Sequence, residues 1–129
     1  MAYPSSPSKN TANQSAYARQ TRQYKQQQIE TASPEEILIM LYEGAIRFLV
    51  IAKNALDDKD IEKFHNNLLR TQHIIIEFMT SLDMELGGEM AVNLYNLYEY
   101  LHYRLVQANI HKAVAMLDEV LDHLRKLVS

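Results

Sequence analysis

A chain of 129 residues is long enough for one domain with its own hydrophobic core, and 47% hydrophobic residues is ordinary for a globular protein. It contains no cysteine, which excludes disulfides, cysteine-ligated metal sites and thiol nucleophiles. The longest uncharged apolar run, Ile37 to Tyr42, is far too short to cross a bilayer, and residues 1–10 lack the apolar core of a signal peptide. We therefore expect a cytoplasmic protein without membrane insertion.

The formal net charge of −3 conceals an asymmetry between the two ends of the chain. The first 29 residues carry four basic residues and no acidic one, a charge of +4, whereas the rest carries nine basic and 16 acidic residues, a charge of −7. The four basic residues are Lys9, Arg19, Arg22 and Lys25. Because they are spread among polar residues, they favour a solvated tail that folds back on an acidic body over a nucleic-acid-binding arm. We expect no nucleic-acid partner.

Residues 1–30 are predicted to be a flexible extension ahead of the folded part at 31–129. The first half of this extension holds two prolines among serines and asparagines, with few apolar groups, a composition typical of disorder. Further on, Tyr17, Tyr24 and Ile29 lie in a stretch rich in glutamine and arginine. This stretch can form a helical turn or lie extended across the body.

Capping and turn residues divide the rest of the chain into four helical segments. Ser33-Pro34-Glu35-Glu36 has the order of a capping box and predicts that the first helix begins there. Asp57 or Asp58 can cap the second helix, Gly87-Gly88 marks the break before the third, and the fourth follows Asn109.

Each segment carries a seam of apolar residues at alternating spacings of three and four, which is the pattern of a helix that packs on its neighbours. The four seams are Leu38, Leu41, Ala45, Phe48, Ala52 and Ala55; then Ile61, Phe64, Leu68, Thr71, Ile75, Phe78 and Leu82; then Ala91, Leu94, Tyr98, Leu101, Leu105 and Ala108; then Ala113, Leu117, Val120, Leu124 and Leu127. Four seams joined by short connections predict an all-α fold, an antiparallel up-down-up-down four-helix bundle with an N-terminal extension.

Three of the segments carry more apolar residues than a bundle helix needs, which is roughly three in seven. The residues outside the seams are Ile39, Tyr42, Ile46 and Leu49 in the first segment, Leu69, Ile76 and Met79 in the second, and Val92, Tyr95 and Val106 in the third. Since one core cannot bury two stripes on several helices, we predict grooves for amphipathic helices of another protein or an interface between copies. A homodimer is therefore one of the expected forms.

Two Glu-x-x-His pairs, Glu62 with His65 and Glu99 with His102, have the spacing of di-iron ligands in helical bundles. Each pair follows its seam by one residue, so the four side chains are expected to point away from the core. The sequence shows no phosphate-binding glycine loop and no local nucleophile–base signature. We predict a protein that binds another chain, without a cofactor and without catalysis. A carboxylate-bridged di-metal enzyme and a structural oligomerising bundle are the alternatives.

Two long motifs in this order resemble the flagellar export chaperone family FliS. The first is YKQQQIETASPEEILIMLYEGAIRFL from Tyr24, and the second is LGGEMAVNLYNLYEY from Leu86. Arg104-Leu105, Ala108-Asn109 and Glu119-Val120 are also similar to the family pattern. The chain departs from it in lacking a tryptophan near the end of the last helix and in a longer stretch before Tyr17.

The resemblance implies a cytoplasmic bundle that binds the C-terminal region of flagellin in apolar grooves. It implies that the bundle prevents premature polymerisation and passes flagellin to the flagellar type III export apparatus. It also implies that an N-terminal segment, here residues 1–30, occupies part of the groove when no client is bound. Together with the surplus stripes, the family motifs give these partner-binding candidates: Tyr24, Ile29, Ile39, Tyr42, Ile46, Leu49, Leu94, Tyr95, Tyr98 and Val106.

Overall fold

The computed structural model describes three stretches of the chain: residues 16–23, 26–27 and 31–129. The predictions made for residues 1–14, Tyr24 and Ile29 lie outside the described residues. Within the described stretches every regular element is a helix and none is a strand, which confirms the all-α fold class. The first described stretch, 16–23, is itself helical.

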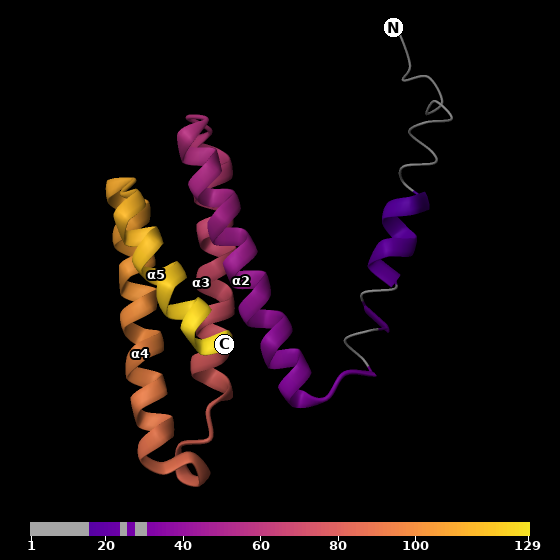
Figure 1. The fold of residues 1–129 in the computed structure, drawn as a ribbon, viewed down its shortest axis with the longest axis vertical. Helices are drawn as coiled ribbons and strands as arrows, with labels where there is room; N and C mark the ends of the chain where they lie inside the picture. The colour runs from indigo at the N-terminus through magenta and orange to yellow at the C-terminus, as the bar shows by residue number, and fades with distance from the viewer. Residues whose placement is uncertain (1–15, 24–25, 28–30) are drawn as a thin grey trace, which may run out of the picture. The chain divides into compact units, whose positions relative to one another are not determined.

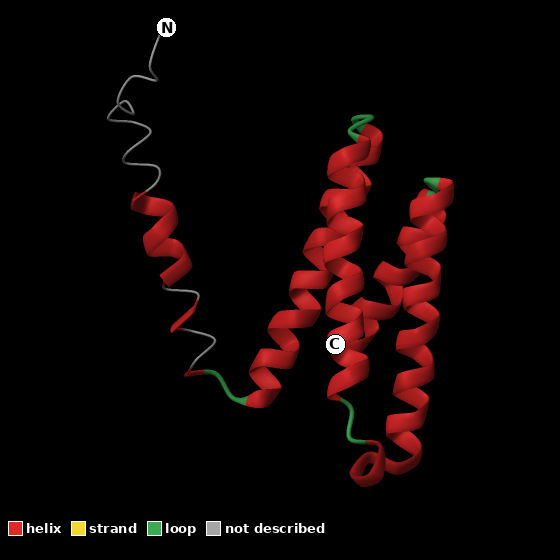
Figure 2. Cartoon of the chain, turned by 180° about the vertical axis from the view of Figure 1, so that it is seen from behind, coloured by secondary structure: helices red, strands yellow, loops and turns green. Residues whose placement is uncertain are grey.

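Four longer helices follow (Figure 1). They are α2 (Pro34–Asp57), α3 (Ile61–Ser81), α4 (Met84–His111) and α5 (Val114–Val128). The chain divides after Ile37 into two parts, of which the second, Leu38–Ser129, is the bundle. Figures 1 and 2 show that neighbouring helices alternate in direction, with the α2–α3 and α4–α5 corners at one end and the α3–α4 corner at the other. The antiparallel up-down-up-down order is therefore confirmed.

α2 begins where the capping residues predict. The backbone N–H of Glu36 donates to the Ser33 hydroxyl over 3.2 Å, and Pro34 is the first helical residue. Proline is well placed there because the first N–H groups of a helix have no partner inside the helix. Two acidic residues in the first turn, Glu35 and Glu36, add a favourable interaction with the helix dipole.

The α2–α3 corner is a left-handed turn centred on Lys59, whose φ is +61°. The Lys59 N–H donates to the Leu56 carbonyl over 3.1 Å, and the Asp60 N–H donates to the Ala55 carbonyl over 2.8 Å. This pair of bonds is a Schellman motif, which satisfies carbonyls that the end of a helix leaves free.

The side chain that caps α3 is Asp60, which accepts the Lys63 N–H over 3.1 Å. The prediction of Asp57 or Asp58 as this cap is wrong by two to three positions. The reason is the Schellman motif, because it uses the residues after Asp57 to close α2 before a new helix can begin.

The α3–α4 corner also differs from the prediction in detail. Asp83 caps a short helical turn that starts at Met84, accepting the N–H groups of Glu85 and Leu86 over 3.1 and 3.0 Å. The predicted break falls inside α4, at Gly88, whose φ of +55° and ψ of −133° are not helical. A glycine fits this backbone conformation, which side chains disfavour. Helical structure therefore begins four residues before the break.

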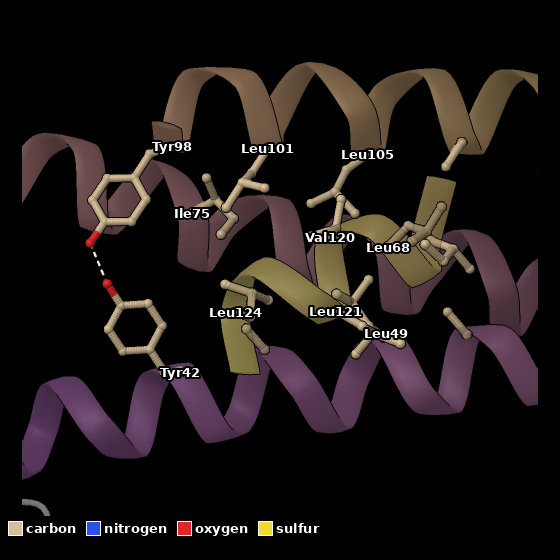
Figure 3. Close-up of a cluster of buried hydrophobic side chains, with 14 of the residues drawn as sticks. Tyr42, Leu49, Leu68, Ile75, Tyr98, Leu101, Leu105, Val120, Leu121 and Leu124 are labelled. Atoms are coloured by element: carbon tan, nitrogen blue, oxygen red, sulfur yellow. Dashed lines mark hydrogen bonds between the residues drawn. The ribbon is translucent and has the colours of Figure 1, made fainter. Parts of the chain in front are cut away.

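The core of the bundle is formed by one face of each helix (Figure 3). The seams predicted for α3, α4 and α5 are largely confirmed. Their buried members are Phe64, Leu68, Thr71, Ile75 and Phe78, then Ala91, Tyr98, Leu101, Leu105 and Ala108, then Leu117, Val120 and Leu124. None of the helices in the described residues is both long enough and apolar enough to cross a bilayer.

The seam predicted for α2 is confirmed at Ala45, Ala52 and Ala55, which are buried, but it is wrong at the large residues. Leu38 is 43% exposed and Phe48 is half-buried, whereas Tyr42 and Leu49, which were predicted to lie outside the core, are buried. A seam through Leu41 and Phe48 and a seam through Tyr42 and Leu49 both include Ala45, so this alanine does not distinguish the two seams. The large neighbours decide: the ring of Phe78 on α3 packs on Tyr42, and the Tyr42 hydroxyl is hydrogen-bonded to that of Tyr98 on α4.

Candidate partner-binding surface

Three predicted partner-binding residues lie in the core rather than on a surface. Tyr42 is 5% exposed, Tyr98 is 3% exposed and Leu49 is fully buried. The ring of Phe78 packs on both tyrosines, with its centroid 4.4 Å from that of Tyr42 and 5.4 Å from that of Tyr98. The two tyrosine hydroxyls, one from α2 and one from α4, form a hydrogen bond (Figure 3). Their position corrects the prediction that Tyr42 and Leu49 line a groove.

The environment of Tyr42 keeps its phenol group protonated. Burial raises the pKa of Tyr42 above its ordinary value of 10.0, and the hydrogen bond with Tyr98 raises it further. A phenolate is disfavoured there because the core offers it neither water nor a cation. This pair is therefore a neutral polar link between α2 and α4.

The other predicted residues lie at or near the surface, but on different helices. Ile39 on α2 is 45% exposed. Ile46 on α2 and Leu94 on α4 are half-buried and pack against the core. Tyr95 and Val106 on α4 are half-buried. The eight predicted residues that the structure describes therefore do not form one groove, and Tyr95 and Val106 belong to a longer surface of α4.

That longer surface is the outer stripe of α4, which we define as Val92, Tyr95, Glu99, Tyr103, Val106 and Ile110. Spacings of three and four put these residues on one side of the helix, away from the buried side that carries Leu101 and Leu105. Tyr103 is 56% exposed and Ile110 is 64% exposed. Neither residue is among the ten partner-binding candidates given above, although their spacing from Val92 contains the signal.

A cavity of about 350 Å³ adjoins the outer stripe. It is lined by Asn96, Glu99, Tyr100 and Tyr103, all of which lie on α4. A second cavity, of about 380 Å³, lies between α2 and α3. It is lined by Ile51, Asp60, Glu62, Lys63, Asn66, Asn67 and Arg70.

Polar contacts with α5 fix one wall of the first cavity. The Tyr100 hydroxyl donates to the Glu119 carboxylate, and the Arg104 guanidinium contacts the same carboxylate over 3.0 and 2.8 Å. The hydrogen bond from Tyr100, together with the hydrogen bond and charge of Arg104, holds the pKa of Glu119 below its usual value. The edge of the Tyr100 ring also packs on His123, with centroids 6.4 Å apart. The ring of Tyr100 is therefore held in one orientation.

The Glu-x-x-His residues lie outside the core. Glu62, His65 and Glu99 are exposed, and His65 is hydrogen-bonded to Asn109 over 2.8 Å. Among residues 16–23, 26–27 and 31–129, no three histidine, aspartate or glutamate side chains lie close enough to hold a metal ion together.

Comparisons with known proteins identify a family and several relatives of this chain. The family model described as "Flagellar protein FliS" matches residues 16–129. The flagellar secretion chaperone FliS of Bacillus subtilis is 37% identical over 97 residues, which cover 75% of this chain and 71% of that protein. FliS of Vibrio cholerae is 36% identical over 102 residues, which cover 79% and 75%. FliS of Salmonella typhimurium is 37% identical over 93 residues, which cover 71% and 69%.

These relatives are named as chaperones, which are binding proteins and not enzymes. The match extends over α2 to α5 and therefore includes the outer stripe of α4 and the cavity beside it. The chain belongs to the FliS family of flagellar proteins.

Proposed function

We propose that this protein is a secretion chaperone for flagellin. It binds the C-terminal region of flagellin in the cytoplasm, prevents premature polymerisation and delivers the client to the flagellar export apparatus. The names of the relatives support a role in flagellar secretion. A secretion chaperone meets its client before export, which supports a cytoplasmic site of action.

The outer stripe of α4 carries the proposal, because it is a helix face, apolar except at Glu99, that the bundle does not use for its own core. Its six side chains, from Val92 to Ile110, recur at the spacing with which one helix packs along another, and five of them are apolar or aromatic. An amphipathic client helix laid along α4 would bury them, as in other helix-in-groove complexes. Its side chains would replace water over Tyr103 and Ile110, the most exposed members.

Exposed apolar residues on the other helices extend the available surface. Leu38, Ile39 and Ile51 lie on α2, and Ile76 lies on α3. A client region with more than one helix could therefore contact several faces of the bundle. The assignment of Ile39 as a partner-binding residue fits this extended surface.

The test is a charge placed in the middle of the stripe. Tyr103→Asp should weaken binding of a flagellin C-terminal fragment about 100-fold, because a carboxylate would lose water inside an apolar contact. The thermal unfolding midpoint should change little, since Tyr103 is exposed. Titration calorimetry and circular dichroism measure the two effects.

Ile61→Asp provides a matched control. Ile61 is exposed to a similar degree as Tyr103 but is the first residue of α3, outside the stripe. It should bind the fragment like the wild type. Equal affinities of wild type and Tyr103→Asp would refute the stripe as the client surface.

A further inference from the structure

Glu99 is an exposed carboxylate on α4. The ion pairs in the described residues use Lys53, Arg104 and Lys126 as cations, and none of them involves Glu99. The sequence contains no lysine or arginine between Arg70 and Arg104. Within the described residues, this part of α4 therefore presents a negative charge that no ion pair neutralises.

Two aromatic rings stand beside this carboxylate in the 350 Å³ cavity. Asn96, Glu99, Tyr100 and Tyr103 are spaced by three, four and seven residues, which puts them on one face of α4. The Tyr100 ring is held by Glu119 and the Tyr103 ring is 56% exposed. A carboxylate, an amide and two accessible π faces thus line one cavity.

This combination is complementary to a cationic side chain. A guanidinium or ammonium group is attracted to the face of a tyrosine ring and forms a charge-assisted hydrogen bond with a carboxylate. Because the Tyr100 ring is already fixed, little side-chain freedom is lost when such a group enters. The formal charge of −7 on residues 30–129 favours the approach of the same class of group.

We propose that this cavity binds a lysine or arginine side chain of the client helix that lies along the outer stripe of α4. The inference rests on the proposed function and adds a polar anchor to it. The apolar members of the stripe supply buried area, whereas the cavity fixes the position of the client helix along α4. Glu99 is thereby a specificity-determining residue.

The experiment compares two neutralised carboxylates in the full chain. The dissociation constant for a flagellin C-terminal fragment is measured by titration calorimetry at low and at high salt for wild type, Glu99→Gln and Glu89→Gln. Glu89 is an exposed carboxylate on the same helix that does not line the cavity. Glu99→Gln should bind about three- to tenfold more weakly at low salt, with a smaller difference at high salt. Glu89→Gln should stay within about twofold of wild type.

Alanine substitutions at each lysine and arginine of the fragment then identify the bound side chain. Exactly one such substitution should abolish the difference between wild type and Glu99→Gln, since both changes remove the same interaction. If every fragment variant shows the same difference, the carboxylate acts through the general field, and the cavity is not a specific site.

The remaining outcomes separate this inference from the proposed function. If the wild type binds the fragment and Glu99→Gln binds it equally well, the cavity site is overturned, whereas the proposed function stands. Tighter binding by Glu99→Gln would show that the cavity holds a basic residue of this chain, such as Arg19 or Arg22, and would also overturn it. If the wild type does not bind the fragment, the proposed function fails, and the inference fails with it.

Discussion

At the scale of single residues, the hydroxyl pair of Tyr42 and Tyr98 is the polar contact that joins α2 to α4 inside the core. A buried hydroxyl that loses its partner costs about 1–3 kcal/mol, whereas removing both partners of a pair costs less. Tyr98→Phe should therefore lower the unfolding free energy by about 1–2 kcal/mol. The double variant Tyr42→Phe/Tyr98→Phe should cost clearly less than the sum of the two single variants.

Urea unfolding of the four proteins measures this coupling. Additive effects of the two substitutions would mean that the hydroxyl pair contributes no interaction of its own. The rings remain in all four proteins, so the contacts with Phe78 serve as an internal control.

The same tyrosine predicts a pH dependence of stability. The pKa of Tyr42 is raised in the folded state above its ordinary value of 10.0, mainly by burial. The stability linked to its phenol group is thus complete below pH 10 and is lost as the pH rises above 10, where the unfolded chain ionises first. The loss is at most about 1.4 kcal/mol per pH unit. Chemical unfolding of wild type and Tyr42→Phe is measured between about pH 9 and pH 11, the range in which an ordinary tyrosine titrates. The free energy of unfolding should fall more steeply with pH in the wild type.

At the scale of elements, the helix ends offer a stabilising substitution. Lys59 has a φ of +61°, a conformation that costs an L-residue about 1–2 kcal/mol and costs glycine little. Lys59→Gly should raise the unfolding free energy by about 0.5–1 kcal/mol after the greater entropy of glycine in the unfolded chain is subtracted. Glu77→Gly, at an exposed position inside α3, should instead lower it by about 0.5 kcal/mol. A loss of stability in Lys59→Gly would contradict the left-handed turn.

Lys112, at the α4–α5 corner, is a less suitable site for the same change. Its φ is +52°, but its ammonium group lies 5.3 Å from the centre of the Phe64 ring. Glycine would remove this contact together with the backbone strain. The two effects would then be difficult to separate.

The helices also show how far sequence reasoning reaches. The seams of α3 and α5 could be predicted because polar residues interrupt their apolar pattern on every other side. α2 is apolar on most of its circumference, so the same spacing fits a seam through Leu41 and Phe48 and a seam through Tyr42 and Leu49. Periodicity cannot choose between them. The choice depends on Phe78 and Tyr98, which are distant in sequence.

The prediction of the candidate surface was incomplete for a similar reason. Tyr95 and Val106 were recognised because they lie outside the seam of α4. Tyr103 and Ile110 lie on the same side, but spacing alone does not tell whether another helix covers that side. Cavities such as the one beside Glu99 need the fixed orientation of Tyr100, which comes from α5.

At the scale of the whole molecule, the charge asymmetry predicts an effect of the N-terminal residues on client binding. We propose that residues 1–30, with a formal charge of +4 up to residue 29, occupy part of the acidic bundle when no client is bound. A tethered segment competes at high effective concentration, so a chain that begins at Thr31 should bind the flagellin fragment at least as tightly as the full chain. Raising the salt concentration should reduce the difference between the two.

Calorimetric titration of both chains at two salt concentrations tests this prediction. A clear loss of affinity in the shortened chain would sink the competition, because it would mean that the segment forms part of the client site. Analytical ultracentrifugation of both chains shows whether the segment affects association between copies.

Between Arg70 and Arg104 the chain offers trypsin no cleavage site. Complete digestion therefore releases the sequence from Thr71 to Arg104 as one peptide, which includes the second half of α3, the buried Tyr98 and all four residues of the cavity beside the outer stripe. A carbodiimide joins a carboxylate directly to an amine that touches it. If a client lysine lies against Glu99, digestion yields this peptide joined to a peptide of the client. Fragment spectra of the joined product can then assign the bond to Glu99 without a structure of the complex.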